Sequence, residues 1–383
     1  MIKTALVHDW LVSMGGAEKC LEVFCDLFPD APLYTIVYAP ETANKMGIPE
    51  NKVCASSLQK IRNIQKRYRK FLPLFPYAIE QFNLDDYDVI LSDSHCVAKG
   101  VLTRADQLHI CYCHTPVRYA WDLTHRYLRE NEMQKGLKST LARSALHYLR
   151  IWDVQTASRV DYFIANSYYT AARIWHCYRR EAKVIYPPVN IDRFNIQSKK
   201  GDYFLFFSRL VPYKKADLVI KTFNQLGLPL KVLGDGPQLD QCRKLAGPNI
   251  EIMGYQDDGV VVESMNQARA LVFAAEEDFG IVPIEAQACG TPVIAYGRGG
   301  ALETVVPADG SNWDTCTGMF FNQQTEASLA EKIKAFVKWE NKFNPNVLRK
   351  NAERFNRERF KKEIEDFKDI KWDEFNKKHT LSL

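Results

Sequence analysis

Apolar runs and helical repeats alternate along the first half of the chain. The run KTALVHDWLV suits a buried strand, and in SMGGAEKCLEVFCDLF, which follows, the apolar residues recur at helical spacing. Gly15 and Gly16 stand at the junction, so the order is strand, glycine turn and helix. This order is the first unit of a doubly wound α/β domain. The later runs DVILSDS, HICYCHT and YFIANS fit further buried strands of the same domain.

The same alternation begins again after VIYPPVNIDRF, where Pro187 and Pro188 cannot continue a helix and favour extended chain. The strands expected next are YFLFFSRL, LKVLGDG, ARALVFAA and PVIAYG, and the helices are DLVIKTFNQL and IEAQAC. Alternating strands and helices predict a parallel sheet with its ligand site at the carboxyl ends of the strands. The sequence therefore predicts two similar α/β domains with a cleft between them. It also predicts a charged, helical tail over residues 346–378.

Length and composition agree with two globular domains. The 383 residues are 46% hydrophobic and 25% charged, which is enough for two buried cores. The net charge of +5 does not by itself indicate nucleic acid, and no recognised nucleic-acid-binding motif accompanies it. No apolar run approaches the roughly 18–20 residues that span a membrane, and the apolar start is too short for a signal peptide. We therefore expect a cytoplasmic protein without nucleic-acid partners.

The ten cysteines are scattered and form no CxxC pair, which in a chain of this length is typical of reduced thiols in a cytosolic protein. Cys111, Cys113 and His114 stand close together in the sequence. However, alternate residues of ICYCH suit one face of a strand, and no second pair of ligands stands nearby. We expect no metal site.

The most informative segment is EDFGIVPIEAQACG, residues 277–290. Glu277 and Glu285 stand eight apart around a Phe-Gly turn, and a short helix is expected to start near Pro283. Amides at a helix N-terminus can hold a diphosphate or sugar hydroxyls, and a carboxylate can accept hydrogen bonds from two neighbouring hydroxyls. Gly280 lets the backbone approach a ligand closely. By itself the pattern also suits an ordinary loop with solvated glutamates.

A second segment, SRLVPYKKADL, ends another expected strand with two cations. Arg209 and Lys214 lie five residues apart just before a helix, where they suit a departing diphosphate. Alone, each is most often a surface charge, but the glutamate loop favours the functional interpretation. The glycines of LGDGP do not form a dinucleotide fingerprint, because Leu239 stands where the third glycine would be.

The order RLVPYKK, LGDGP, IMGY and EEDFGIVPIEAQACGTPVIAYGRGGALETV is similar to the donor domain of glycosyltransferase family 4, whose members are retaining enzymes of the GT-B fold. GGAEKCLEVF, CYCHTPVRYAWD, RIWDVQTASRVDYFIANS and VIYPPVN resemble a subgroup that includes bacterial O-antigen mannosyltransferases. The resemblance implies two Rossmann-like domains that face each other across a cleft. The first would bind the acceptor over residues 1–190, completed by a C-terminal helix at about 360–383. The second would bind the nucleotide-sugar over residues 191–359.

The resemblance also implies roles for single residues. Arg209 and Lys214 would contact the donor diphosphate, Glu277 would lie beside the transferred sugar, and His114 would lie near the sugar and the attacking hydroxyl. Lys215 stands where the family often has glycine. The donor-binding residues implied are Gly16, Gly254, Tyr255, Phe279, Gly280, Ile281 and Glu285, with Glu285 on the ribose hydroxyls.

Other residues are weaker candidates. Asp93, His95 and Trp10 are candidates for the cleft, and Gly299, Gly300 and Glu303 form a turn expected to shape the pocket. For Asp122 and Asp153, a structural role as partners of arginines is as good an interpretation as a functional role.

Residues 60–79 combine a basic run with an apolar one. A basic, partly apolar segment suits contact with anionic lipid headgroups, although a solvated helix face beside a core loop explains it equally well. Family members that use lipid-linked acceptors often carry such a patch. The residues expected to touch the membrane are Lys60, Arg62, Lys66, Arg67, Arg69 and Lys70.

These features favour a peripheral enzyme on the inner face of the plasma membrane. By the resemblance to the mannosyltransferase subgroup, it would transfer a hexose, mannose from GDP-mannose, to a saccharide on a polyprenyl diphosphate, in bacterial surface polysaccharide synthesis (O-antigen, the polysaccharide of lipopolysaccharide, or exopolysaccharide). No cofactor and no metal would be needed, because two fixed cations replace the metal. The alternatives are the same fold with a UDP-sugar donor, a sugar-nucleotide 2-epimerase, and a non-catalytic sugar-binding scaffold.

Overall fold

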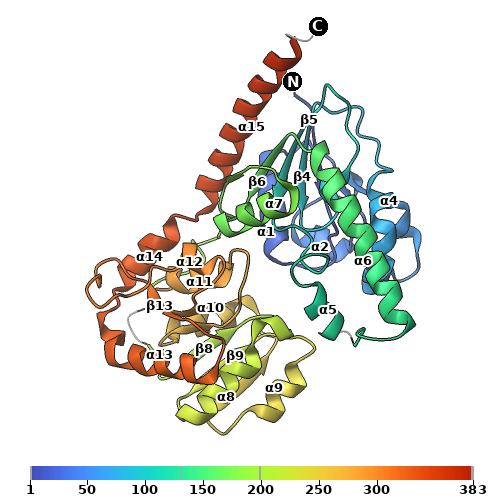
Figure 1. Cartoon of the computed structure of the whole chain (residues 1–383). Helices are drawn as coiled ribbons and strands as arrows, with labels where there is room; N and C mark the ends of the chain where they lie inside the picture. The colour runs from blue at the N-terminus through green and yellow to red at the C-terminus, as the bar shows by residue number, and fades with distance from the viewer. Residues whose placement is uncertain (1, 131, 198–199, 381–383) are drawn as a thin grey trace. The chain divides into compact units, whose positions relative to one another are not determined.

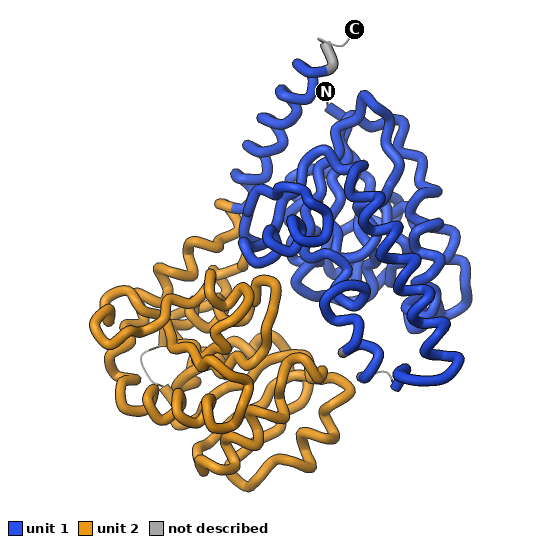
Figure 2. Tube along the Cα trace, in the orientation of Figure 1, with its two compact units in different colours: residues 1–188, 360–383 blue, residues 189–359 orange. Residues whose placement is uncertain are grey.

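The computed structural model describes residues 2–130, 132–197 and 200–380 (Figure 1). The chain divides into two units: residues 1–188 with 360–383, and residues 189–359 (Figure 2). Each unit is built on one parallel sheet, and we describe the two separately.

The sheet of unit 1 has seven strands in the order β3-β2-β1-β4-β5-β6-β7. Chain order runs outward from β1 in one direction and, after a reversal, outward from β4 in the other. This arrangement is the doubly wound, Rossmann-like topology, in which ligands bind at the carboxyl ends of the strands beside the reversal. The strands are β1 Thr4–His8, β2 Leu33–Thr35, β3 Val53–Ala55, β4 Val89–Ser94, β5 Leu108–Cys113, β6 Tyr162–Ala165 and β7 Ala182–Val184.

Helices cover both faces of this sheet. Local sequence explains several of their ends: Ser167, for example, caps α7 by accepting a hydrogen bond from the N–H of Thr170. The helices are α1 Gly16–Leu27, α2 Pro40–Lys45, α3 Ile64–Arg67, α4 Phe75–Ile79, α5 Thr124–Glu130, α6 Leu137–Thr156, α7 Tyr168–Tyr178 and α15 Arg357–Thr380, with 3₁₀ turns η1 Glu50–Lys52, η2 Ser57–Lys60, η3 Tyr68–Leu74, η4 Ala98–Gly100 and η5 Ala157–Arg159.

The last helix, α15, returns to unit 1 and supplies part of its core. Phe360 is fully buried and packs against Phe24 of α1 and Tyr112 of β5, with ring centroids 5.5 and 5.6 Å away. Ile364 and Phe375 belong to the same cluster of buried side chains. The predicted tail is therefore helical, but it forms two helices, because α14 ends at Glu353 and α15 begins at Arg357.

Unit 2 repeats the topology with a six-stranded parallel sheet in the order β10-β9-β8-β11-β12-β13. Its reversal lies between β8 and β11. The strands are β8 Phe204–Phe207, β9 Leu230–Leu233, β10 Ile250–Gly254, β11 Leu271–Phe273, β12 Val293–Tyr296 and β13 Gly318–Phe321. The helices are α8 Ala216–Leu226, α9 Leu239–Leu245, α10 Asp258–Gln267, α11 Ile281–Ala288, α12 Ala301–Thr304, α13 Glu326–Trp339 and α14 Pro345–Glu353, with 3₁₀ turns η6 Pro212–Lys214 and η7 Glu340–Lys342.

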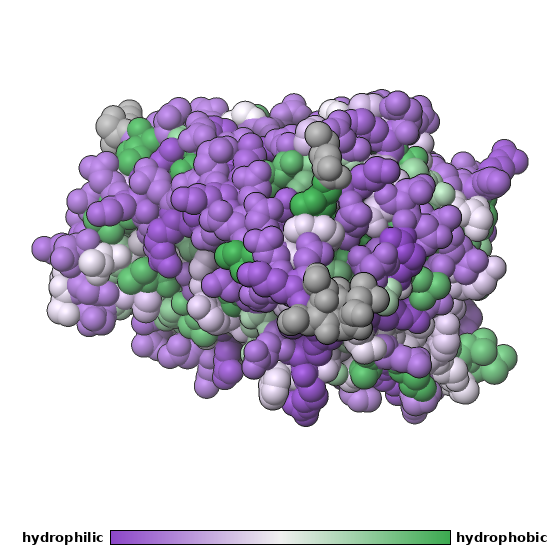
Figure 3. Space-filling view, turned by 90° about the horizontal axis from the view of Figure 1, so that it is seen from above, coloured by the Kyte–Doolittle hydropathy of each residue, from purple (hydrophilic) through white to green (hydrophobic). Residues whose placement is uncertain are grey.

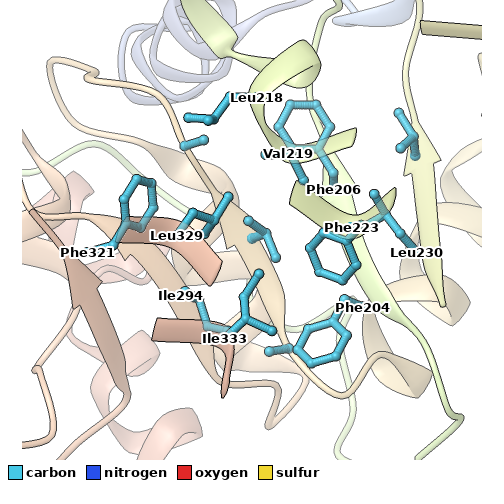
Figure 4. Packing of buried hydrophobic residues seen from close by; sticks show 14 of the residues in the cluster. Phe204, Phe206, Leu218, Val219, Phe223, Leu230, Ile294, Phe321, Leu329 and Ile333 are labelled. Atoms are coloured by element: carbon cyan, nitrogen blue, oxygen red, sulfur yellow. The ribbon is translucent and has the colours of Figure 1, made fainter. Parts of the chain in front are cut away.

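The core of unit 2 lies between the sheet and helices α8 and α13 (Figure 4). Phe204 of β8 meets Phe223 of α8 and Phe336 of α13, with ring centroids 5.2 and 5.8 Å apart. Leu329 and Ile333 of α13 are fully buried in the same cluster. This packing fixes β8, the strand from which the loop with Arg209 and Lys214 leaves.

One face of the protein is mostly polar. On the face shown in Figure 3, hydrophilic side chains predominate and hydrophobic ones lie in small separate groups. No helix of the described residues is long and apolar enough to cross a membrane.

A buried ion pair ties four segments of unit 1 together. The ammonium of Lys99 donates to Oδ1 of Asp153 (2.6 Å) and to the hydroxyl of Thr156 (3.1 Å). The other oxygen of Asp153 accepts from Nε1 of Trp121 and from the hydroxyl of Tyr178. Asp153 is thus the structural partner of a lysine rather than of an arginine.

We predict that Lys99→Met lowers the free energy of unfolding of unit 1 by about 3–5 kcal/mol, because the Asp153 carboxylate stays buried without its cation. Urea unfolding followed by circular dichroism measures the loss. The double variant Lys99→Met/Asp153→Leu removes both charges and should recover part of it. A double variant no more stable than the single one would contradict this explanation.

Lys215 has a left-handed backbone, with φ +62° and ψ +34°, at the residue that precedes α8. Left-handed geometry costs a residue with a Cβ roughly 1–2 kcal/mol, and glycine avoids that cost. The backbone therefore gives a physical reason for glycine at this position.

We predict that Lys215→Gly raises the free energy of unfolding by about 1 kcal/mol. The matched control is Lys221→Gly, which changes an exposed lysine within α8 and should lower it by about 1 kcal/mol. Thermal unfolding of the two variants beside the parent gives the comparison. Equal destabilisation by both substitutions would show that the left-handed backbone at Lys215 is not strained.

Candidate functional site

Two loops of unit 2 meet at the carboxyl edge of its sheet. One follows β8 and ends in the 3₁₀ turn Pro212–Lys214, and the other follows β11. Since β8 and β11 are parallel neighbours, both loops leave at the same edge. There the ammonium of Lys214 forms an ion pair with Oε1 of Glu277. The structure thus brings together two residues predicted to act on the donor.

Arg209 lies on the first of these loops with its side chain exposed. The loop after β9 supports the backbone beside it, because the N–H of Leu210 donates to the carbonyl of Asp235 (2.9 Å). Gly234 has φ +127°, and a Cβ there would lie 1.9 Å from the carbonyl oxygen of Ser208. Only glycine allows this approach. Within the described part of the chain, the guanidinium of Arg209 makes no ion pair.

A glycine turn supports the loop of Glu277 in the same way. The N–H of Gly300 donates to the carbonyl of Glu277 (2.9 Å). A Cβ on Gly299 would lie 2.3 Å from that same oxygen, and a Cβ on Gly300 would lie 2.3 Å from Cα of Phe279. Phe279 is itself buried against Phe355, with ring centroids 5.6 Å apart. The turn after β12 therefore fixes the backbone that carries Glu277.

Helix α11 begins at Ile281, directly after this loop. Gly280 precedes it with φ +87°, a conformation that favours glycine. The amides of Phe279, Gly280 and Ile281 thus lie at the start of a helix, where the helix dipole favours anions. Glu285, in the next turn, is 3% exposed.

Sequence reasoning missed Arg193, which contacts this glutamate. One guanidinium nitrogen lies 3.9 Å from Oε1 of Glu285, and the other lies 3.1 Å from Oδ2 of Asp258. Its Nε is buried and has no hydrogen-bond partner among the described residues. Arg193 stands alone after the proline joint, and no motif in the sequence marks it.

Gly254 and Tyr255 lie at the end of β10, the edge strand next to β9. Gly254 has φ +69°, and its carbonyl accepts a hydrogen bond from the N–H of Gly234 (2.8 Å). Tyr255 is 74% exposed. The pair is therefore joined to the loop that supports Arg209, and the Tyr255 ring is free to meet a ligand.

In unit 1, Asp93 joins two histidines at the reversal of the sheet. His8 is the last residue of β1 and lies in register with Asp93 of β4. Nδ1 of His8 is 2.8 Å from one oxygen of Asp93, and Nε2 of His114 is 2.6 Å from the other. His114 follows β5 and is held by its own backbone, since its carbonyl accepts from the amide of Asn166 (3.0 Å). Sequence reasoning proposed His114 and Asp93 separately and missed His8.

Burial and charge act in opposite directions on this cluster. Burial disfavours the charged form of His8, but Asp93 and Glu18 outweigh it and raise the pKa of His8 to about 10. Burial also disfavours the charged form of Asp93, which by itself would raise the pKa of this carboxyl, but His114 and His8 lower it to about 2. At neutral pH His8 is therefore positively charged and Asp93 negatively charged.

A second carboxylate fixes the neighbouring loop. Asp9 is fully buried and accepts hydrogen bonds from four consecutive backbone N–H groups, those of residues 95–98. Its Oδ2 also lies 3.0 Å from Nδ1 of His95. The His95 ring meets the edge of Trp10 with centroids 4.5 Å apart. The structure thus brings the weaker candidates His95 and Trp10 together beside the Asp93 cluster.

Gly16 is the first residue of α1, directly after β1 and its loop. Glu18 in the first turn of that helix lies 3.9 Å from Nε2 of His8, a buried nitrogen without a hydrogen-bond partner among the described residues. The start of α1 therefore lies beside the Asp93 cluster.

The six basic residues predicted to touch a membrane are all exposed, as are Leu74 and Tyr77, while other apolar neighbours are buried. Ile64, Tyr68 and Phe75 are buried in the core of unit 1. The exposed basic residues are Lys60, Arg62, Lys66, Arg67, Arg69 and Lys70.

No group of three or more His, Cys, Asp or Glu side chains in the described residues could hold a metal ion. All ten cysteines are free thiols.

Comparison with known proteins gives relatives on both units. The chain is 31% identical over 180 residues to an uncharacterized glycosyltransferase of Methanocaldococcus jannaschii, covering 45% of this chain and 48% of that one. It is 24% identical over 342 residues to the alpha-1,3/1,6-mannosyltransferase ALG2 of Eremothecium gossypii, covering 73% and 63%. It is 38% identical over 122 residues to a GDP-mannose-dependent phosphatidylinositol monomannoside mannosyltransferase of Corynebacterium glutamicum, covering 27% and 31%. The matches thus span about a third to two thirds of these relatives' own lengths.

Solved structures share the fold over nearly the whole chain. The HepE protein of Anabaena, in complex with UDP and glucose, superposes with a TM-score of 0.68 at 20% identity, covering 96% of this chain and 99% of that one. Sucrose-phosphate synthase of Thermosynechococcus elongatus superposes with a TM-score of 0.69 at 15% identity, covering 97% and 99%. At these identities the likeness concerns the fold, which is the two-domain GT-B fold.

Two family models match the chain in succession. The model described as Glycosyltransferase Family 4 covers residues 14–193, and the one described as Glycosyl transferases group 1 covers residues 189–355. Together they span residues 14–355, which includes most of both Rossmann-like units, so the chain belongs to glycosyltransferase family 4.

Proposed function

We propose that this protein is a retaining hexosyltransferase that moves mannose from GDP-mannose to a saccharide carried on a polyprenyl diphosphate. The observation that carries the proposal is the ion pair of Lys214 with Glu277 beside the exposed Arg209. A diphosphate needs cations held in place, and a sugar needs a carboxylate as hydrogen-bond acceptor. These groups lie on loops that glycine contacts hold in position.

The bond between the anomeric carbon and the diphosphate oxygen breaks, and the acceptor oxygen bonds to the same face of that carbon. The acceptor proton passes to the departing diphosphate, so no protein nucleophile is consumed. Arg209 and Lys214 stabilise the negative charge that the diphosphate gains. The amides at the start of α11 add fixed dipoles to the same task.

The Lys214–Glu277 pair has a simple role before the donor arrives. Each side chain neutralises the other, so neither charge stands uncompensated at the edge of the sheet. When the donor binds, this ion pair separates. Lys214 then pairs with the diphosphate, and Glu277 accepts hydrogen bonds from the sugar hydroxyls. Glu285 holds the ribose hydroxyls, and Gly254 and Tyr255 lie along the base.

In unit 1, Asp93 orients His114, to which we assign the contact with the attacking hydroxyl. Because Asp93 is ionised and shared with a charged His8, it holds the His114 ring in place and is a poor acceptor for its proton.

Mannose and GDP are supported by the names of two relatives, a mannosyltransferase and a GDP-mannose-dependent mannosyltransferase. The exposed basic residues 60–70 support a lipid-linked acceptor, since each basic residue near an anionic surface contributes about 1 kcal/mol. In this proposal the protein works at the inner face of the plasma membrane in surface polysaccharide synthesis. Two fixed cations do the work that a metal ion does elsewhere, so no cofactor is needed.

The first prediction concerns the donor. With EDTA present, we expect GDP-mannose to raise the melting temperature and to be hydrolysed slowly to GDP, while UDP-glucose, UDP-galactose and UDP-N-acetylglucosamine have little effect. Thermal unfolding and nucleotide release measure the two effects. Preference for a UDP-sugar would keep the fold and the site but exclude the mannosyl assignment. Interconversion of the donor without an acceptor would indicate an epimerase. If no donor binds, the protein would be a non-catalytic scaffold.

The second prediction concerns Lys214. We expect Lys214→Ala to lower kcat for transfer by a factor of about 10²–10³, because one fixed charge on the departing diphosphate is lost. Lys215→Gly is the matched control: it removes the adjacent lysine and should keep the rate within a few fold. The proposal fails if Lys214→Ala transfers sugar as fast as this control.

A further inference from the structure

A cationic pocket lies in unit 1 between helix α6 and residues 120–125. Its volume is about 300 Å³, within the size range of small-molecule sites. Arg143 and Arg150 line it from α6, and Trp121 and His125 line it from the other side. None of these residues belongs to the Asp93 cluster or to the Lys214–Glu277 pair.

The two arginines have hydrogen-bond donors to spare. Nε of Arg143 donates to the hydroxyl of Ser139 (3.2 Å), and one Nη of Arg150 donates to the carbonyl of Ala120 (2.8 Å). A guanidinium has five N–H donors, and neither arginine forms an ion pair with a described residue. Seven residues separate them, which is two helical turns, so they lie on one face about 10.5 Å apart along the axis. Two such groups suit a phosphate or diphosphate, which guanidinium groups bind bidentately.

The pocket wall is joined to His114. The loop after β5 begins at His114 and reaches the pocket at Ala120 and Trp121. Arg173 of α7 braces this loop at two points, donating to the hydroxyl of Thr115 (2.6 Å) and to Asp122 (2.7 Å). A ligand held in the pocket is therefore positioned by the same rigid segment that carries His114.

Helix α6 has a second apolar face that the core does not use. Its inner face packs Leu146, Leu149 and Trp152 into the core of unit 1. Its outer face exposes a stripe with spacings of four, seven and three residues, which places the side chains on one side of a helix. The stripe comprises Leu137 (76% exposed), Leu141 (62%), Tyr148 (47%) and Ile151 (55%).

Charge indicates what covers this stripe. The one acidic residue of α6, Asp153, is buried, while Lys138, Arg143 and His147 are exposed. Residues 57–79, which carry the exposed basic run, pack into the same core cluster as α6 (Figure 1). An apolar helix face with basic neighbours and no exposed acid suits the surface of an anionic membrane.

We infer that this pocket binds the diphosphate of a lipid whose chain remains in the membrane against the outer stripe of α6. The inference rests on the lipid-linked acceptor of the proposed function and adds the place where its diphosphate binds. The arginines hold the phosphate oxygens, the stripe enters the lipid surface, and the loop from His114 spans the distance to the reacting hydroxyl.

The pocket is tested by binding of farnesyl diphosphate to the full chain, followed by calorimetry, with farnesol and inorganic pyrophosphate as partial probes. We expect farnesyl diphosphate to bind more tightly than either. Arg143→Gln should weaken it about tenfold, because charge-assisted hydrogen bonds are lost. Lys135→Gln, which removes an exposed charge just before helix α6 and outside the pocket, should not. Equal affinities of the two variants would overturn the assignment.

The stripe is tested by sedimentation with vesicles of phosphatidylglycerol. Leu141→Ser/Ile151→Ser should lower the bound fraction several-fold, while Ile370→Ser, which changes an exposed isoleucine of α15, should not. If the double variant keeps vesicle binding but changes the oligomeric state, the stripe is an interface between copies and the inference fails. If vesicles bind but farnesyl diphosphate does not, the arginines contact ordinary headgroups and the diphosphate assignment fails. Both tests are independent of the donor, so their failure is distinguishable from failure of the proposed transfer, which the donor panel measures.

Discussion

Each sheet depends on one parallel pairing, that of its first strand with the strand that starts its second half. In unit 1 this pairing joins β1 to β4, and in unit 2 it joins β8 to β11. At both places the strand order reverses, so the loops that leave the two strands turn away from each other and leave space at the edge. His8 and Asp93 meet at the first reversal, and Lys214 and Glu277 meet at the second. The chemistry of both units therefore follows from where the sheets reverse.

Close backbone approach turns that space into a defined site. Gly234 touches the Ser208 carbonyl, and Gly299 and Gly300 touch the loop of Glu277, at distances that no Cβ would permit. Each contact thus restrains the loop after one strand by packing it against the loop after a neighbouring strand. Lys215 is the exception, because it keeps a side chain in a left-handed conformation next to Lys214. The chain tolerates that strain at the turn that sets the direction of Lys214.

Much of this arrangement could be predicted from the sequence, because apolar runs and glycine turns indicate it over short stretches of the chain. The strands β1, β4, β5 and β8 were predicted from their apolar runs, and a glycine turn marked the loop after β1. The strands β2, β3, β7, β10 and β13 were missed. The first three have only three residues each, and so short a run has no detectable alternation. Partners across the sheet were missed for another reason. His8 meets Asp93 over 85 residues and Arg193 meets Glu285 over 92, and only the register of parallel strands or the packing of helices sets such contacts.

In both clusters a carboxylate at the edge of the sheet is paired with a cation. Burying a carboxylate is costly unless a cation or hydrogen-bond donors accompany it, and in each unit one carboxylate has a cation from across the reversal. In unit 1 the pair is buried, so a charged His8 fixes Asp93 permanently and leaves the second oxygen of Asp93 to orient His114. In unit 2 the Lys214–Glu277 pair is partly exposed to solvent. Burial thus distinguishes two similar ion pairs: water is excluded from the pair in unit 1 and can reach the pair in unit 2.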